Sequence, residues 1–248
     1  EVFAGITKYD IKQTHYEIQL LHQPAGTWRD LTLNFPLYQG VRSVEVGLDP
    51  DALIEAPAPR APDPIVFYGT SITQGGCAAR PGMAFPAILS RRLQYPCVNL
   101  GFSGNGRGQP EVAHAIADIA SCSLFVLDYD ANCPDAAHLA RTLPAFIDIL
   151  RARHPTTPIL VVSRIPTGSE AWNPGAITQR QERARAQEQV VEQRSVGGEQ
   201  GLHFLDGSKL LGGADFHECT VDGSHPTDLG FLRIADGLEP VLQAILQG

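Results

Sequence analysis

Residues 65–76 read IVFYGTSITQGG, and this stretch decides how the rest of the chain is interpreted. Its first four residues are apolar and predict a short buried strand, which Gly69 ends at a sharp turn. Ser71 then lies at the carboxyl end of that strand. In open α/β sheets ligands bind outside these ends, and a helix that begins there points its positive dipole at the same place. We therefore expect Ser71 to be a nucleophile.

Two other interpretations of the stretch stay open from these residues alone. Serine and threonine are common in turns, so GTSITQGG could be an ordinary strand-to-helix turn. It could also be a glycine-rich loop that binds phosphate, although the lysine of a Walker loop is missing.

Length and composition favour a globular protein with a sizeable core. The chain has 248 residues, of which 43% are hydrophobic, enough for one large domain or a domain with a smaller module. Its formal net charge of −8 argues against a nucleic-acid partner, because there is no excess of lysine and arginine to neutralise phosphates. We expect a small-molecule or carbohydrate partner instead.

The cysteines and the apolar segments bear on the compartment. Five cysteines without a CxxC pair indicate neither a complete disulfide framework nor a zinc ribbon, so we expect a reducing, cytoplasmic compartment. No apolar segment approaches the roughly 20 residues that span a bilayer, and the first residues lack a signal-peptide pattern, so no membrane partner is expected. Because the chain does not begin with methionine, we also expect upstream sequence to be missing.

The chain divides into two predicted parts. Residues 1–60 comprise a β module and a linker, and residues 61–248 form an α/β domain. Strands are predicted at HYEIQL (15–20), LTLNFPLY (31–38) and VRSVEVGLD (41–49), which is too little for a complete sandwich, so the module is expected to be the end of a larger β domain. The proline-rich residues 55–64 indicate a semi-rigid linker.

Strands and helices alternate from residue 65 onward, which predicts a parallel sheet with crossover helices. Five short apolar strands are expected, at residues 65–68, 97–100, 124–128, 159–163 and 203–205. This pattern predicts a flavodoxin-like, doubly wound sheet. A polar helix over 178–194 is expected to be mostly solvated, and Gly237 and Pro240 predict a kink or break in the last helix.

Four loops at the expected strand ends hold the residues that carry chemistry: GTSITQGG with Ser71, NLGFSGNGRG (99–108), DYDANC (128–133) and DGSHP (222–226). Serine needs an adjacent base, which His225 could be, and Asp222 is close enough to orient that imidazole. Backbone N–H groups of Ser71 and Gly104 and the amide of Asn132 could stabilise an oxyanion. There is no metal-ligand cluster, and no cofactor is implied.

These four blocks resemble the SGNH, or GDSL-type, hydrolases, in the branch that carries a β-sandwich ahead of the catalytic domain. The resemblance covers residues 68–226 and leaves residues 1–60 outside it. It implies Ser71 as nucleophile and first oxyanion donor, Gly104 and Asn132 as the other donors, and Asp222 with His225 as the rest of a triad. The sequence departs from the family at two positions, where Thr70 replaces the aspartate of GDS and Cys133 replaces an aspartate after the third-block asparagine.

Several alternatives to these residues were weighed. Ser103 is a rival nucleophile because GFSG resembles a nucleophile elbow, although Asn105 stands where GxSxG has glycine. His217 near Asp215 is a second choice of base. His225 could instead cap the final helix, and Asn132 could be only a turn residue. Arg107 could contact an anion, but we favour a solvated loop charge.

The sequence thus predicts a serine ester hydrolase that acts through an acyl-enzyme on a small-molecule or carbohydrate ester. An acyltransferase with the same triad and an acceptor alcohol is the main alternative, and the β module and residues 166–175, with Trp172, could wall a pocket for that alcohol. A non-catalytic glycan-binding protein is a further alternative.

Overall fold

The computed structural model describes residues 12–15, 17, 19, 28–56, 61, 63–213 and 215–248. Five strands form one parallel sheet in the order β2-β1-β3-β4-β5. Their bounds are β1 Ile65–Gly69, β2 Cys97–Gly101, β3 Leu124–Asp128, β4 Ile159–Val162 and β5 Leu202–Leu205. All five predicted strands are confirmed, and the order is that of the expected flavodoxin-like, doubly wound sheet.

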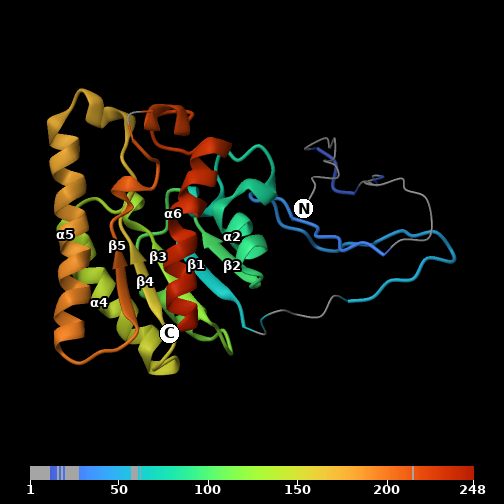
Figure 1. Cartoon of the computed structure of the whole chain (residues 1–248), viewed down its shortest axis with the longest axis horizontal. Helices are drawn as coiled ribbons and strands as arrows, with labels where there is room; N and C mark the ends of the chain where they lie inside the picture. The colour runs from blue at the N-terminus through green and yellow to red at the C-terminus, as the bar shows by residue number, and fades with distance from the viewer. Residues whose placement is uncertain are drawn as a thin grey trace.

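Six α-helices connect and follow the strands in the described residues (Figure 1). They are α1 Ser71–Gln74, α2 Phe85–Leu93, α3 Pro110–Ala117, α4 Ala136–Arg153, α5 Pro174–Val196 and α6 Asp228–Gln247. Five 3-10 turns lie in the loops: η1 Pro81–Met83, η2 Asp130–Asn132, η3 Gly168–Ala171, η4 Gly207–Lys209 and η5 Phe216–Cys219.

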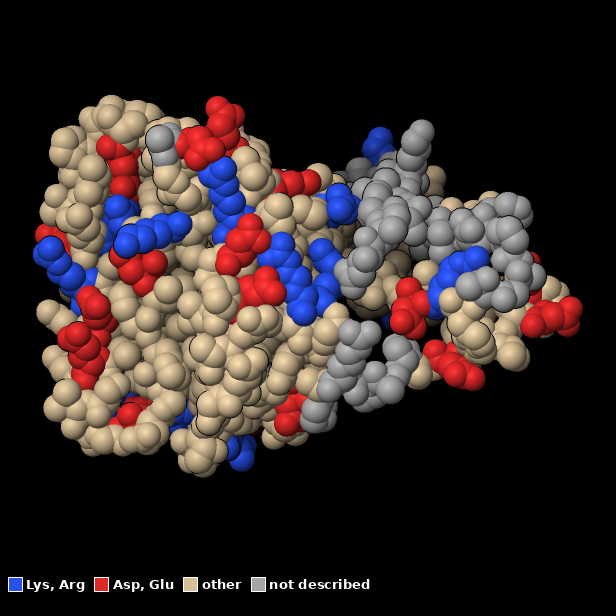
Figure 2. Space-filling model, in the orientation of Figure 1, with Lys and Arg blue, Asp and Glu red and all other residues tan. Residues whose placement is uncertain are grey.

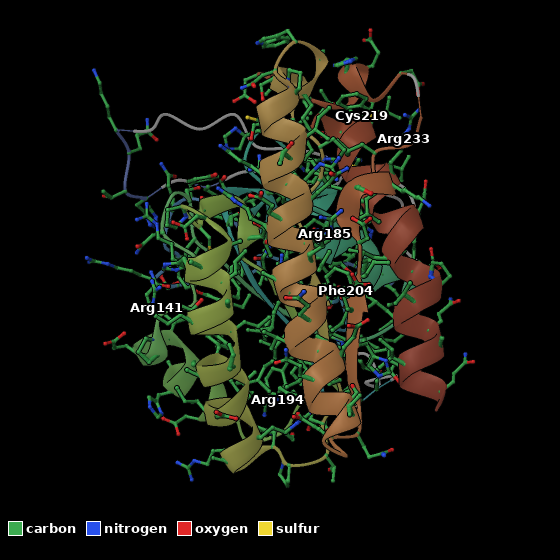
Figure 3. All side chains as sticks on the ribbon, turned by 90° about the vertical axis from the view of Figure 1, so that its left-hand side faces the viewer. Arg141, Arg185, Arg194, Phe204, Cys219 and Arg233 are labelled. Carbon is green, nitrogen blue, oxygen red and sulfur yellow. The ribbon has the colours of Figure 1, made fainter. Side chains whose placement is uncertain are left out.

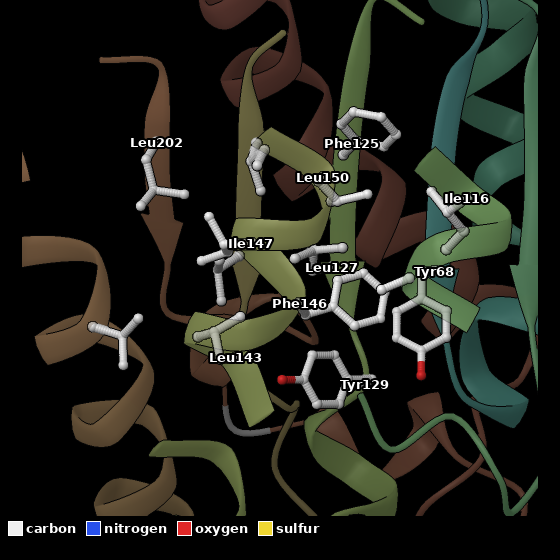
Figure 4. Packing of buried hydrophobic residues seen from close by; sticks show 14 of the residues in the cluster. Tyr68, Ile116, Phe125, Leu127, Tyr129, Leu143, Phe146, Ile147, Leu150 and Leu202 are labelled. Carbon is white, nitrogen blue, oxygen red and sulfur yellow. The ribbon is translucent and has the colours of Figure 1, made fainter. Parts of the chain in front are cut away.

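The sheet is covered by helices on both faces, because side chains alternate along each buried strand. One face packs against α3, α4 and α5, and includes Tyr68, whose ring stacks on Phe146 of α4 at a centroid distance of 4.8 Å (Figure 4). The other face packs against α2 and α6, with Phe67 and Phe231 among its buried residues. These two apolar layers fix the sheet, and therefore the position of the loops at its carboxyl edge.

Two helices differ from expectation. The last helix, α6, continues through Gly237 and Pro240 without a break. A Cβ at Gly237 would lie 2.5 Å from Leu210 Cδ2, so this glycine permits close packing. Helix α5 is longer than predicted and is not simply solvated, since it buries Arg183, Gln187, Val190 and Val191. Arg185 and Arg194 lie along the same helix (Figure 3).

Residues 28–56 contain no helix or strand, so the strands predicted at 31–38 and 41–49 are wrong for this structure. The alternating apolar side chains of these segments are exposed, for example Leu31 at 66% and Val46 at 65%, and no second layer covers them. A strand pair without such a layer is marginal in water. The strand predicted at 15–20 lies largely outside the described residues, and the division into a β module and a catalytic domain stays a prediction.

Charges of both signs are mixed on the face seen in Figure 2. Several of them form ion pairs, including Arg92 with Asp236 and Glu239, and Arg233 with Asp215. Among the helices that the structure describes, none combines the length and the apolar character needed to cross a membrane.

Candidate active site

Ser71 is the first residue of α1, directly after the turn that ends β1. Thr70 caps this helix: its hydroxyl accepts the Ile72 N–H at 3.2 Å, while the Thr73 hydroxyl accepts the Thr70 N–H at 3.3 Å. Threonine and aspartate both serve at an N-cap. The replacement of aspartate by Thr70 therefore preserves the local support of Ser71. Gly69 is needed beside it, because a Cβ there would collide with the Thr73 hydroxyl and the Asp128 carbonyl.

Two hydrogen bonds join Ser71 to residues 151 and more positions away in the chain. Ser71 Oγ lies 2.8 Å from His225 Nε2, and His225 Nδ1 lies 2.7 Å from Asp222 Oδ2. The imidazole and the carboxylate are 32% and 50% exposed, so the group opens to solvent. The structure thus brings together the serine, histidine and aspartate that the sequence singled out.

The Asp222 carboxylate is held in its ionised form. Its pKa is lowered to about 2, chiefly because it accepts hydrogen bonds from the His225 backbone N–H at 2.7 Å and from the His225 ring. The Ser224 N–H donates a further bond at 2.9 Å. A carboxylate can only accept, so Nδ1 carries the imidazole proton and Nε2 is left to accept from the Ser71 hydroxyl.

The three expected oxyanion donors come from three different loops. Gly104 has a φ of +69°, a conformation that favours glycine. The Asn132 amide donates to the Phe102 carbonyl at 3.2 Å, which ties η2 to the loop that contains Gly104. In the described part of the chain no hydrogen bond uses the Ser71 or Gly104 N–H, so both remain available to a ligand.

The loop after β2 is braced by side chains that the sequence did not mark as functional. Arg107 donates to the Gly104 carbonyl at 3.0 Å, so this exposed arginine is more than the solvated charge we favoured. The buried Tyr68 hydroxyl donates to Gln109 Oε1 and accepts the Gly108 N–H, both at 2.8 Å. These bonds fix the backbone on both sides of the glycine turn.

The loop after β3 is anchored to α5 through the buried Asp130. Its carboxylate accepts the Arg164 N–H and the Gln187 amide, each at 3.0 Å, and lies 3.5 Å from Arg183 Nη1. Burial raises the pKa of Asp130, while the Arg164 and Arg183 charges oppose that rise. Arg183 also donates to the Pro134 carbonyl at 2.7 Å, so this cluster holds Asn132 from both sides. The signal in the sequence was the spacing of Arg183 and Gln187 on one face of α5.

Asp128 lies below α1 at the end of β3. The Thr73 hydroxyl donates to its carboxylate at 2.8 Å. Desolvation by burial raises the pKa of Asp128 to about 7, although the Thr73 bond opposes this rise. A second ionisable group close to Ser71 therefore titrates near neutral pH.

The rival residues have other partners. The Ser103 hydroxyl bonds Tyr38 and Gln74 at 2.8 and 2.9 Å, and in the described residues it contacts no imidazole. His217 lies on η5, where its ring packs on Phe216, and Asp215 binds Arg233 instead. Cys133 is buried and its thiol donates to the Tyr129 carbonyl, so it is a packing residue.

The loop with Trp172 lies against the Asp222 loop. The Gly168 N–H donates to the Gly223 carbonyl at 2.7 Å, and the Trp172 side chain is 75% exposed. An exposed aromatic side chain is therefore attached to the segment that carries Asp222 and His225.

The comparisons with known proteins agree with this geometry. Residues 62–243 match the model of the GDSL-like lipase/acylhydrolase family. A solved structure from Bacteroides ovatus, described as a GDSL-like lipase, is 39% identical with a TM-score of 0.70, and the match covers 75% of this chain and 54% of the other. No curated protein matches the sequence.

Two further solved structures share the fold. One is a salicylyl-acyltransferase from a tetracycline biosynthetic pathway, 24% identical over 75% of this chain and 56% of the other, with a TM-score of 0.65. Another is a family two carbohydrate esterase from Clostridium thermocellum, solved with cellohexaose, 17% identical over 79% and 68%, with a TM-score of 0.60. The chain thus spans about half the length of the first two structures it matches.

Proposed function

Because the chain belongs to the GDSL-like lipase/acylhydrolase family, we propose that it is a serine ester hydrolase that works through an acyl-enzyme. One observation carries this proposal: an unbroken chain of hydrogen bonds runs from Asp222 through His225 to the Ser71 hydroxyl. These distances, 2.7 and 2.8 Å, are those of a base that can take the proton of a nucleophile.

In the first half-reaction Ser71 Oγ attacks the ester carbonyl carbon while His225 Nε2 accepts its proton. The carbonyl π electrons move to the oxygen, which becomes an oxyanion. When the tetrahedral intermediate collapses, the bond to the alcohol oxygen breaks and the imidazolium returns the proton to it. Asp222 remains an anion throughout and stabilises the imidazolium.

In the second half-reaction water takes the place of the alcohol. His225 accepts a proton from the water, whose oxygen attacks the acyl carbon. Collapse then breaks the bond to Ser71 Oγ, which recovers the proton from the imidazolium. The products are the free acid and the original enzyme.

The oxyanion in both steps requires fixed donors. We assign this role to the N–H groups of Ser71 and Gly104 and to the Asn132 amide. The unoccupied N–H groups and the two buried anchors of these loops support the assignment, since preorganised donors need no rearrangement during the reaction.

For the substrate we propose a small-molecule or carbohydrate ester. The exposure of His225 and Asp222 supports an open site that admits a bulky polar alcohol. The fold neighbour that was solved with cellohexaose supports the carbohydrate choice by analogy. An acyltransferase differs only in which hydroxyl attacks the acyl-enzyme, so it is a measurable outcome of the same experiment.

The test is ester turnover by Ser71→Ala beside its matched control Ser103→Ala, with p-nitrophenyl acetate as substrate. We expect the first variant to lose turnover and remain folded, and the second to retain it. Wild-type turnover by Ser71→Ala would refute the proposal. Addition of sugar alcohols, followed by measurement of transferred ester against free acid, identifies the attacking hydroxyl; ester as the main product at millimolar acceptor would favour the acyltransferase.

A further inference from the structure

Residues 34–38 lie against the loop that carries Ser71, although they precede the sheet. The Gln74 amide donates to the Leu37 carbonyl at 2.9 Å, and the Tyr38 hydroxyl lies 2.8 Å from Ser103 Oγ. A Cβ at Gly75 would lie 2.7 Å from Leu37 Cδ1, so that glycine also permits the contact. Figure 1 shows this blue segment reaching the rest of the molecule from one side.

Tyr38 is also close to the base. A Cβ at the buried Gly76 would lie 2.7 Å from the Tyr38 hydroxyl and 3.6 Å from His225 Cδ2. The missing side chain at Gly76 therefore leaves the Tyr38 oxygen near the imidazole edge next to Nε2. This edge faces the alcohol that leaves or enters, because Nε2 gives that alcohol its proton and takes it back.

The hydrogen bonds around Tyr38 have a fixed direction. The Leu37 carbonyl can only accept, so it must bind the NH₂ of Gln74, which leaves Gln74 Oε1 as an acceptor. Gln74 Oε1 accepts both the Ser103 N–H at 3.0 Å and the Ser103 hydroxyl at 2.9 Å. Ser103 Oγ has then used its proton, so the Tyr38 hydroxyl donates to it.

The consequence concerns the Tyr38 oxygen. Its proton is directed at Ser103, so toward a substrate this oxygen can only accept. The Tyr38 side chain is 57% exposed, so the oxygen can be reached by a ligand. The group that satisfies it is a donor, and a hydroxyl carried by the alcohol half of the ester is such a donor.

We propose that Tyr38, oriented by Ser103 and Gln74, is a substrate-positioning residue that accepts a hydrogen bond from a second hydroxyl of the alcohol, and so selects polyhydroxylated alcohols such as sugars. This inference rests on the proposed esterase function and names the alcohol it takes. It also gives residues 34–38 a role in the site that no residue of the α/β domain fills.

The experiment compares two acetates of similar size: the 6-acetate of methyl glucoside, and cyclohexylmethyl acetate, which lacks every hydroxyl. Tyr38→Phe removes only the oxygen. We expect it to lower kcat/KM for the sugar acetate by roughly 3- to 10-fold, mainly through KM, which is what one net hydrogen bond is worth. Cyclohexylmethyl acetate should change less than about 2-fold under the same estimate.

Two further variants separate the alternatives. Ser103→Ala should produce a similar, sugar-specific loss, and the double variant should lose little more, because both act through one bond chain. Phe35→Leu, in the same exposed segment, is the matched control and should affect neither ester. An equal loss on both esters, or no loss on the sugar acetate, would overturn the proposal. Failure of the esterase function itself would appear separately, as turnover that survives Ser71→Ala.

Discussion

The Asn132 amide donates to the carbonyl oxygen of Phe102 at 3.2 Å, and this bond joins the loop after β3 to the loop after β2. The proposed oxyanion donors Asn132 and Gly104 are therefore held by one contact. An amide carries two N–H groups, and the second is available to a ligand.

Replacing Asn132 by alanine should lower kcat by about 10²- to 10³-fold with little change in KM, because the lost donor acts mainly in the transition state. Steady-state kinetics with p-nitrophenyl acetate measures this. Asn173→Ala is the control, since that asparagine only caps α5. A rise in KM with kcat intact would instead make Asn132 a ground-state contact.

Replacing Arg183 by methionine should destabilise the protein by about 3 kcal/mol, because Asp130 is left buried without its ion-pair partner. We expect kcat to fall as well, since the same cluster anchors Asn132. Denaturant unfolding and kinetics measure the two effects. Arg185→Met, on the exposed side of α5, should be nearly silent. If Arg183→Met were equally silent, the cluster would not anchor the loop.

Asp128 predicts a pH dependence of stability. Its pKa is raised to about 7 in the folded protein, above the unfolded value of 3.8. The folded state therefore binds the extra proton between these values, and the stability that this group contributes is lost as pH rises from about 4 through about 7. Asp128→Asn keeps an acceptor for the Thr73 hydroxyl and cannot ionise.

The Tm of Asp128→Asn should therefore exceed that of the wild type by more at pH 8 than at pH 5, as measured by thermal unfolding in matched buffers. A difference that does not grow with pH would show that Asp128 ionises without cost.

His225 predicts the pH dependence of activity. Only the neutral imidazole can accept the Ser71 proton, so kcat/KM should rise with pH through a single ionisation. Asp222, whose pKa is about 2, stays ionised throughout this range. His225→Ala should remove nearly all activity, whereas His217→Ala should be nearly silent, because His217 packs on Phe216. The reverse pattern would assign the base to His217.

The sheet and the main site residues could be predicted because both leave local signals. Parallel strands buried on both faces are continuous apolar runs, as in residues 65–68 and 124–128. Loops at the carboxyl ends of such strands meet at one edge, which brought Ser71, Gly104 and Asn132 into consideration together. Asp222 and His225 lie in one short loop, so their pairing needed no knowledge of the fold.

The remaining features depend on contacts between distant polar residues. Tyr38 meets Ser103 across 65 positions, and Gln187 meets Asp130 across 57. A single polar residue has no periodicity that indicates its partner. The opposite error occurred at residues 41–49, where apolar alternation predicted a strand although the side chains are exposed. Alternation records a half-buried surface only when another layer covers it.

The central claim is that Ser71 forms the acyl-enzyme, and intact-mass spectrometry of the protein after rapid mixing with p-nitrophenyl acetate tests it most directly. We predict a mass increase of one acetyl group on the wild type, located at Ser71 by peptide mapping and absent from Ser71→Ala. An adduct of equal yield on Ser71→Ala, or one that maps to Ser103, would contradict the account.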